Sequence, residues 1–169
     1  MASSSDAGVP ERGPGPFNIL FVCTGNTCRS PMAMALARAE LERRGWRQVA
    51  VRSAGVAAAA GQPAADFALE VLAEKGLDLG SHRTTPLTPE LVEWADLIAV
   101  MGPGHIRALE AMDADGKVSL VTDFLDTADA GTPVPDPIGG SEALYRETRD
   151  RLAEAVAAML DRLEPILAP

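Results

Sequence analysis

Short apolar runs alternate with longer amphipathic stretches along most of the chain. The first run, FNILFV over 17–22, is mostly apolar and ends at a loop that contains glycine. Such a run is typical of a strand buried on both faces of a parallel sheet. Three further runs predict strands over 49–53, 96–101 and 118–121.

Helix signals occupy the segments between and after these runs. Pro31 stands at a first helical position, and Gly45 and Gly76 follow the last residues of two helix-forming stretches. The Pro- and Gly-rich stretch 131–140 predicts a loop, and apolar residues at near-helical spacing follow it. The expected helices cover 32–44, about 64–75, a short segment opening at 88–90, 106–112 and 141–163.

The order of these elements is an alternation of strands and helices. It predicts an α/β fold in which helices cover both faces of a parallel sheet and ligands bind at the carboxyl ends of the strands. A length of 169 residues with 47% hydrophobic content fits one domain. Residues 1–16 are rich in Ala, Ser, Gly and Pro and lack hydrophobic periodicity, so we expect a disordered N-terminal tail before a domain over 17–169.

The chain is acidic, with a formal net charge of −9. A broad nucleic-acid or anionic-membrane surface is therefore not expected, because such partners select basic faces. No apolar run reaches the roughly 18 to 20 residues needed to cross a bilayer. The two cysteines are five positions apart, which is too few and too close for the disulfide framework of a secreted domain, so we expect a cytoplasmic protein.

The loop after the first strand, VCTGNTCRSP over 22–31, carries the candidate chemistry. Its backbone N–H groups from 23 to 29 can surround one anion, and the following helix directs the positive end of its dipole to the same point. Gly25 permits left-handed backbone angles, and Asn26 is the other residue that best tolerates them. Arg29 adds a planar, bidentate donor that suits phosphoryl oxygens. The pattern predicts a phosphate-binding loop.

The same positive groups favour the thiolate form of Cys23, a nucleophile to which Ser30 can donate a hydrogen bond. A lone cysteine after a strand is usually a small buried apolar residue, but this one stands within ten contiguous positions that suit an anion. A metal site built from Cys23, Cys28, His82 and His105 is a weaker alternative, because the histidines are scattered and there is no second C-x-x-C element. A P-loop NTPase is excluded because no Gly-Lys-Ser/Thr sequence ends the loop.

The string VCTGNTCRSP resembles the active-site loop of the low-molecular-weight protein phosphatases, and the similarity extends over roughly 17–163. The resemblance implies a single-domain, three-layer αβα, Rossmann/flavodoxin-like fold whose four-stranded parallel sheet has the order 2-1-3-4. The other segments that carry it are VRSAG at 51–55, SHR at 81–83 with Leu87, the stretch 95–101 and PDP at 135–137.

The resemblance also implies roles in the reaction. Cys23 would be the nucleophile, Arg29 a phosphate ligand and Ser30 the group that stabilises the thiolate. Cys28 looks like the family's second cysteine, which can trap an oxidised Cys23 as a reversible disulfide. The expected substrate-binding set is Thr24, Gly25, Asn26, Thr27, Cys28, Arg29 and Ser30.

A supporting shell is implied around the loop. Asn26 would be held by Ser30, Ser53 and His82, and these contacts would fix the loop in shape. His105 is expected to be a surface residue outside this shell.

The leaving group needs a proton, so a carboxylic acid must reach the loop from elsewhere. Asp136 is the candidate, because the prolines of segment 133–137 fix the backbone while the Asp136 side chain stays accessible. An Asp before a Pro is more often a turn residue, but this one matches the family's Asp-Pro acid motif. Three other acids nearby lack a following proline and are expected to be solvated charges: Asp123, Asp126 and Asp129.

The expected reaction is an in-line attack by the Cys23 thiolate, with protonation of the leaving atom by Asp136. A phosphocysteine intermediate would then be hydrolysed by a water that Asp136 deprotonates. The loop amides and Arg29 would supply the charge stabilisation, so neither a metal nor another cofactor is expected.

The pocket lip favours phosphoarginine over phosphotyrosine as the substrate. Tyrosine-directed members hold the flat ring between aromatic residues after Ser-Ala-Gly and after Asp-Pro, where this chain has the non-aromatic stretch 56–61 and Ile138. Thr27 replaces the branched aliphatic residue that is usual there, and its hydroxyl favours a polar leaving group such as a guanidinium. With DP-x-GGS-x-x-x-Y-x-x-T, the loop resembles the bacterial protein-arginine phosphatases, which tend to carry an aromatic residue at the Ile138 position.

The expected partners are phosphorylated proteins, and phosphotyrosine remains the alternative substrate. The protein itself is expected to be a monomer or weak dimer. An arsenate reductase of the same fold relays oxidation through further cysteines near His82, and segment 82–90 contains none. A phosphoprotein-binding module without turnover could lack the nucleophile or the acid, whereas Cys23 and Asp136 are both present.

Overall fold

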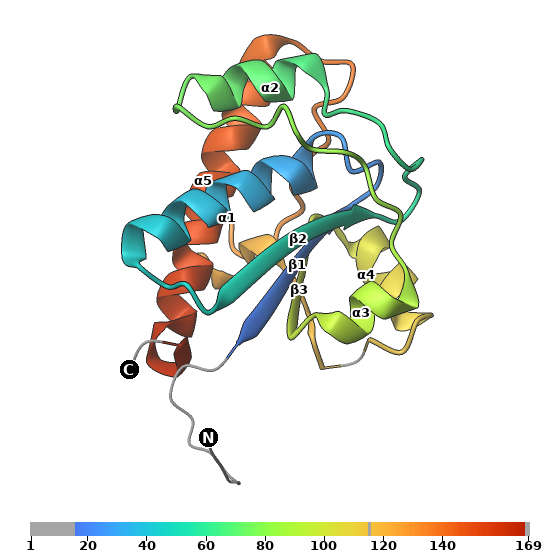
Figure 1. Ribbon diagram of the computed structural model, residues 1–169, viewed down its shortest axis with the longest axis vertical. Helices are drawn as coiled ribbons and strands as arrows, with labels where there is room; N and C mark the ends of the chain where they lie inside the picture. Colours follow the sequence, from blue (N-terminus) through green and yellow to red (C-terminus); the bar gives the residue numbers. More distant parts are fainter. Residues whose placement is uncertain (1–15, 115, 168–169) are drawn as a thin grey trace, which may run out of the picture.

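The computed structural model describes residues 16–114 and 116–167, which form a parallel sheet between two layers of helices (Figure 1). The four strands lie in the order β2-β1-β3-β4, and each neighbouring pair is parallel. The predicted fold class and strand order are therefore confirmed. The strands are β1 (Phe17–Cys23), β2 (Val49–Gly55), β3 (Leu97–Val100) and β4 (Val118–Leu120).

Helices cover both faces of the sheet. Helices α1, α2 and α5 lie on one side, and α3 and α4 lie on the other (Figure 1). The bounds are α1 (Arg29–Arg44), α2 (Asp66–Ala73), α3 (Pro89–Trp94), α4 (Pro103–Glu110) and α5 (Glu142–Leu167), with a 3-10 turn η1 (Val121–Phe124) after β4. No helix of the described residues is long and apolar enough to cross a membrane.

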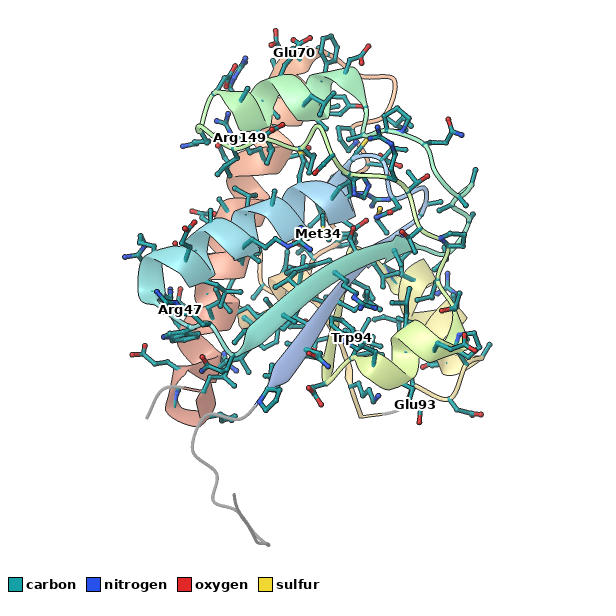
Figure 2. The ribbon with its side chains drawn as sticks, in the orientation of Figure 1. Met34, Arg47, Glu70, Glu93, Trp94 and Arg149 are labelled. Carbon is teal, nitrogen blue, oxygen red and sulfur yellow. The ribbon has the colours of Figure 1, made fainter. Side chains whose placement is uncertain are left out.

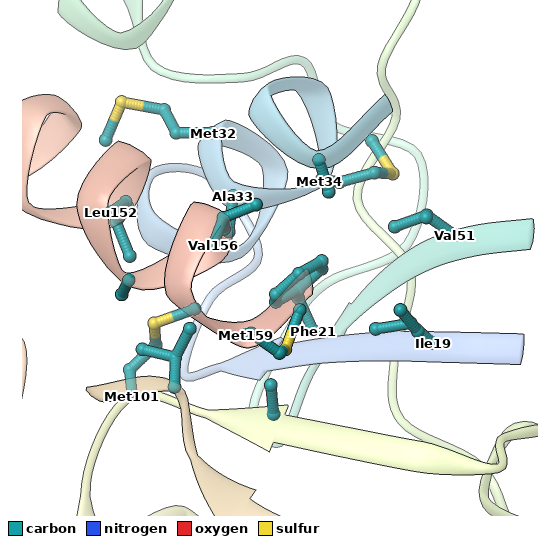
Figure 3. Close-up of a cluster of buried hydrophobic side chains, with 14 of the residues drawn as sticks. Ile19, Phe21, Met32, Ala33, Met34, Val51, Met101, Leu152, Val156 and Met159 are labelled. Atoms are coloured by element: carbon teal, nitrogen blue, oxygen red, sulfur yellow. The ribbon is translucent and has the colours of Figure 1, made fainter. Parts of the chain in front are cut away.

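Strand β1 is buried on both faces, as its unbroken apolar run predicts. Ile19 and Phe21 belong to the core between the sheet and α1, α2 and α5 (Figure 3). Leu20 and Val22 belong to the second core, which packs against α3 and α4. Since successive side chains of a strand point to opposite faces, one strand supports both layers. Strand β1 thus holds its last residue, Cys23, in a fixed position at the carboxyl edge of the sheet.

The observed boundaries differ from the expected ones by three or more residues in three places. Helix α4 begins at Pro103, three residues before the expected start, and α1 begins at Arg29, inside the loop. Helix α5 runs past the expected end at 163 to Leu167, which is buried. The expected tail over 1–16 lies, apart from Pro16, outside the described residues.

Candidate active site

The phosphate loop, residues Cys23 to Arg29, joins β1 to α1 at the carboxyl edge of the sheet. Cys23 is almost fully buried, with 2% of its surface exposed. Its Sγ atom lies 2.9 Å from Ser30 Oγ and accepts a hydrogen bond from the Asn26 backbone N–H at 3.3 Å. Both contacts stabilise negative charge on the sulfur, and the thiolate is the nucleophilic form of a cysteine.

Asn26 fixes the shape of the phosphate loop. Its backbone is left-handed, with φ of 60°, a conformation that Asn tolerates better than most residues. Its side-chain amide donates to Ser30 Oγ at 2.7 Å and to Ser53 Oγ at 3.0 Å. Its Oδ1 atom accepts from the Thr85 N–H at 2.8 Å, and His82 Nε2 lies 2.9 Å from its backbone carbonyl. The expected contacts with Ser30, Ser53 and His82 are present, and Thr85 adds one that the sequence did not indicate.

His82 reaches the loop as a neutral donor. A carbonyl oxygen only accepts, so the proton of the neutral ring lies on Nε2. Burial lowers the pKa of His82 below its ordinary value despite the bond to Asn26, and the charges of Arg38 and Arg83 lower it further. The ring is therefore uncharged at neutral pH.

Gly55, at the end of β2, allows the sheet to approach the loop closely. A Cβ atom at this position would lie 2.5 Å from the Thr24 carbonyl oxygen and 2.9 Å from the Asn26 nitrogen. Both neighbours are backbone atoms that cannot move aside. Glycine is therefore required here by contact with the loop.

Arg29 is buried and is held by the segment that carries Asp136. One guanidinium nitrogen donates to the Val134 carbonyl at 2.8 Å. The other lies 3.4 Å from both Thr24 Oγ1 and Asp136 Oδ2. The buried Nε atom has no hydrogen-bond partner among the described residues. A phosphoryl oxygen in the loop would be a suitable acceptor for this free N–H group.

Asp136 comes to the phosphate loop from the acid loop, residues 131–140. Its carboxylate is 38% exposed, and Oδ1 accepts from the Ile138 N–H at 3.1 Å. The carboxyl group is thus accessible to substrate and adjacent to Arg29. Two of the neighbouring acids have other contacts: Asp123 accepts from the Leu120 N–H, and Asp129 pairs with Arg151.

Cys28 contacts Tyr145, a residue that the sequence analysis included in a motif but gave no role. Its Sγ atom is 3.3 Å from the Tyr145 hydroxyl and 3.5 Å from Thr27 Oγ1. Burial raises the pKa of Cys28, and the contacts with Tyr145 and Thr27 oppose that effect. Burial also raises the pKa of Tyr145, which therefore stays protonated and can donate to the sulfur. Both cysteines are free thiols.

The expectation that His105 is a surface residue is wrong. The side chain is only 7% exposed, and Nε2 lies 2.9 Å from Thr24 Oγ1, while the buried Nδ1 has no partner among the described residues. Burial and the charge of Arg29 lower the pKa of His105, and Asp136 opposes them. Helix α4 starts directly after β3, at the same edge as the phosphate loop, and this early start turns His105 inward. The proline of the Gly-Pro-Gly sequence at 102–104 was the sequence signal for this early helix start.

The metal alternative finds no support in this geometry. His82 contacts Asn26, and His105 contacts Thr24. Within 16–114 and 116–167, no three His, Cys, Asp or Glu side chains are grouped so that they could hold a metal ion.

Residues 18–166 match a family described as "Low molecular weight phosphotyrosine protein phosphatase". The chain belongs to this family. It is similar to the protein-arginine-phosphatases of Bacillus subtilis, with 41% identity over 148 residues, and of Geobacillus stearothermophilus, with 39% identity over 151 residues. Each alignment covers 88% of this chain and 97% of the relative.

A solved structure of the YwlE arginine phosphatase is similar to this member of the phosphotyrosine protein phosphatase family, with a TM-score of 0.82 and 40% identity. The match covers 88% of this chain and 96% of that chain. The solved protein is a Cys-to-Ser mutant with a phosphorylated active-site serine.

The lip of this family member's pocket has aliphatic side chains where a ring-binding slot needs flat walls. Val56, just beyond β2, is 37% exposed, and Ile138 in the acid loop is 62% exposed. Thr27 is partly buried, with its hydroxyl toward Cys28. The aromatic residue Phe67 was not expected near the site. Its ring packs edge-on against Tyr145, with 5.5 Å between the ring centroids. Thr27 therefore adds a partly buried hydroxyl to a region where Val56 and Ile138 are aliphatic.

Proposed function

We propose that this phosphatase hydrolyses phosphoarginine in proteins through a phosphocysteine intermediate. The observation that carries the proposal is the convergence of three groups on one loop. Cys23 Sγ accepts a hydrogen bond, the buried Arg29 Nε–H has no partner in the part of the chain that the structure describes, and the Asp136 carboxylate lies 3.4 Å from the Arg29 guanidinium. Nucleophile, phosphate ligand and acid are the groups that phosphoryl transfer needs.

In the first step the Cys23 thiolate attacks phosphorus in line with the bond to the leaving nitrogen. The S–P bond forms, the P–N bond breaks, and Asp136 donates its proton to the guanidine nitrogen that departs. The loop amides and Arg29 hold the phosphoryl oxygens as charge develops on them.

In the second step water attacks the phosphocysteine and transfers a proton to Asp136. The P–O bond forms and the S–P bond breaks, which regenerates the thiolate and releases inorganic phosphate. Ser30 Oγ and the Asn26 N–H lie beside the departing sulfur and lower the cost of its negative charge.

Phosphoarginine is favoured by the lip and by the relatives. Thr27 offers a hydroxyl to a guanidinium, and Val56 and Ile138 offer no aromatic wall to a phenol ring. The two relatives named above, at 41% and 39% identity, are protein-arginine-phosphatases. The phosphorylated serine in the related structure occupies an active site whose cysteine was replaced, as a covalent mechanism would require.

The cell context follows from the chemistry. Because Cys23 must stay a thiol, we place the enzyme in the reducing cytoplasm, acting on phosphorylated proteins as a monomer or weak dimer. Size-exclusion chromatography with light scattering over a range of protein concentrations tests the oligomeric state.

The deciding experiment compares kcat/KM on two peptides of the same sequence, one with phosphoarginine and one with phosphotyrosine. Wild type is expected to prefer phosphoarginine, and Thr27→Ile is expected to shift the preference toward phosphotyrosine. Thr27→Val removes the hydroxyl at nearly constant volume, so it separates polarity from size. An unchanged preference in both variants would show that Thr27 is not the selector.

Cys23→Ser tests the covalent step. This variant should lose turnover while inorganic phosphate still binds, since the loop amides and Arg29 remain. Full activity in Cys23→Ser would overturn the mechanism, and preference of wild type for phosphotyrosine would leave the mechanism intact but reassign the substrate.

A further inference from the structure

A second cavity lies beside the edge strand β2, away from the acid loop. It has a volume of about 370 Å³ and lies between α1, α3 and the segment 81–85. Figure 2 labels Met34, which lines it, and Trp94, whose ring packs against one of its arginines. The polar residues that line it include Arg38, Arg52, Arg83, Ser53, Ser81 and His82.

The arginine cavity, as we call it, is locally basic in an acidic chain. The protein has a formal net charge of −9, yet three arginines and no carboxylate line the cavity. Arg146, Arg149 and Arg151 on α5 each pair with a carboxylate. None of the three cavity arginines has an ion pair within the part of the chain that the structure describes.

The three guanidinium groups contact neutral partners instead. Arg38 donates to the Val51 carbonyl at 2.7 Å, and Arg83 donates to the His82 carbonyl at 2.7 Å. Arg52 lies over the ring of Trp94, 4.5 Å from its centroid. Each arginine is thereby oriented by a protein contact, and none of the three charges is balanced by an ion pair with another described residue, so the exposed cavity suits an anion.

We propose that the arginine cavity binds a compact anion with two linked phosphoryl groups, such as a diphosphate. A diphosphate carries more negative charge than a single phosphate, so it balances three guanidinium groups better. The hydroxyls of Ser53 and Ser81 line the same wall as further donors. The adjoining cavity shares Arg38 and His82 but adds Glu42 and Asp78, and these carboxylates confine the anion to the side of Arg52 and Arg83.

The location gives the ligand a route to the phosphate loop. Ser53 and His82 line the cavity and each contacts Asn26, which sets the shape of that loop. A bound anion would lie one side chain away from Asn26. The binding itself does not depend on the proposed phosphatase activity, so the two can be tested separately.

The probe is methylenediphosphonate, a diphosphate analogue whose P–C–P bridge resists cleavage. Isothermal titration calorimetry on the full chain should show two sites in wild type, one in the phosphate loop and one in the arginine cavity. The double variant Arg52→Gln/Arg83→Gln should bind at the cavity at least tenfold more weakly. Arg47→Gln/Arg162→Gln removes the same charge from exposed positions outside the cavity and should bind as wild type does. Circular dichroism confirms folding, and both double variants should hydrolyse an aryl phosphate at the wild-type rate.

Arg29→Gln separates the two sites. It removes the cationic ligand of the phosphate loop, so the remaining affinity for methylenediphosphonate should be that of the cavity. Loss of all binding in Arg29→Gln, or wild-type binding in Arg52→Gln/Arg83→Gln, would overturn the proposal. Inorganic phosphate should bind the cavity at least tenfold more weakly than the diphosphonate, and equal affinity would contradict the assignment to a diphosphate.

Discussion

His105 connects helix α4 to the phosphate loop through a single hydrogen bond with Thr24. Thr24 Oγ1 also lies 3.4 Å from an Arg29 guanidinium nitrogen, so His105 can help to position Arg29, the proposed phosphate ligand, through Thr24. We expect His105→Ala to lower kcat/KM by about two- to tenfold, the value of one hydrogen bond of about 0.5–1.5 kcal/mol. Steady-state kinetics on a phosphopeptide measures the loss.

His105→Gln is the control for this prediction. A glutamine amide can present a polar atom close to the position of His105 Nε2, so it should recover most of the activity lost in His105→Ala. Burial and the charge of Arg29 lower the pKa of His105, so the neutral ring is favoured at neutral pH and an uncharged glutamine is a suitable replacement. Equal losses in the two variants would show that the packing of the ring matters and its hydrogen bond does not.

Tyr145 acts on Cys28 in the same indirect way. Its hydroxyl is 3.3 Å from the Cys28 sulfur and lowers the pKa that burial raises. Tyr145→Phe should therefore make the Cys28 thiolate scarcer and slow its reaction with an oxidised Cys23, by about fivefold if one hydrogen bond of about 1 kcal/mol is lost. Mass spectrometry of the Cys23–Cys28 disulfide after timed exposure to hydrogen peroxide gives the rate. Cys28→Ser fixes the background, and an unchanged rate in Tyr145→Phe would exclude this role.

At the scale of elements, Glu74 ties the end of α2 to α5. Its carboxylate accepts from Arg146 at 2.6 Å and from Arg149 at 2.7 Å, and these bonds hold its pKa at about 2. A lowered pKa stabilises the fold above the ordinary value near 4.5, and this stabilisation is lost as the pH falls toward 2. Glu74→Gln should lower the melting temperature by only roughly 1–3 °C at pH 7, because the Glu74 carboxylate is 40% exposed. The decrease should be smaller at pH 3, where part of the stabilisation is already lost.

Glu70, one turn earlier on α2, provides a control of opposite sign (Figure 2). Desolvation and the nearby Glu142 raise its pKa, so its charged form costs stability at neutral pH. Glu70→Gln should leave the melting temperature unchanged or slightly higher at pH 7. A decrease equal to that of Glu74→Gln would point to a loss of helix propensity in both variants.

The elements themselves were largely readable from the sequence. The run 17–22 predicts a strand buried on both faces, and β1 contributes to both cores. The end of α5 was predicted at 163, the last of the regularly spaced apolar positions, whereas the helix continues to the buried Leu167, whose carbonyl accepts a hydrogen bond from Gln48. Local signals fail here because tertiary packing decides the boundary.

At the scale of the whole molecule, the site was predictable where its chemistry is contiguous in sequence. The loop from Cys23 to Arg29 can be read as one string, and Asp136 is marked by its following proline. Tyr145 and His105 could not be given roles, because Tyr145 meets Cys28 across 117 positions and His105 meets Thr24 across 81. Such pairs form only when helices pack on the sheet, and no periodicity encodes which side chains then touch.

The charge of the whole molecule sets one last expectation, on how substrates approach. A net charge of −9 repels acidic phosphopeptides at long range, whereas Arg29 and the loop amides attract the phosphoryl group only at contact. Raising NaCl from 10 to 150 mM shortens the screening length from about 30 Å to about 8 Å. We therefore expect kcat/KM to rise about two- to fivefold for a phosphopeptide rich in Asp and Glu.

A peptide with the same phosphorylated residue but flanked by Lys is the control. Its kcat/KM should fall over the same range of salt, since screening weakens its attraction to the acidic surface. A fall for both peptides would mean that chloride competes in the phosphate loop or that salt weakens the contact with Arg29. A rise in kcat/KM for the acidic peptide together with a fall for the basic one would assign the salt effect to the surface charge. Cys23→Ser should bind these peptides without turnover, so its association rates would show whether salt acts on binding.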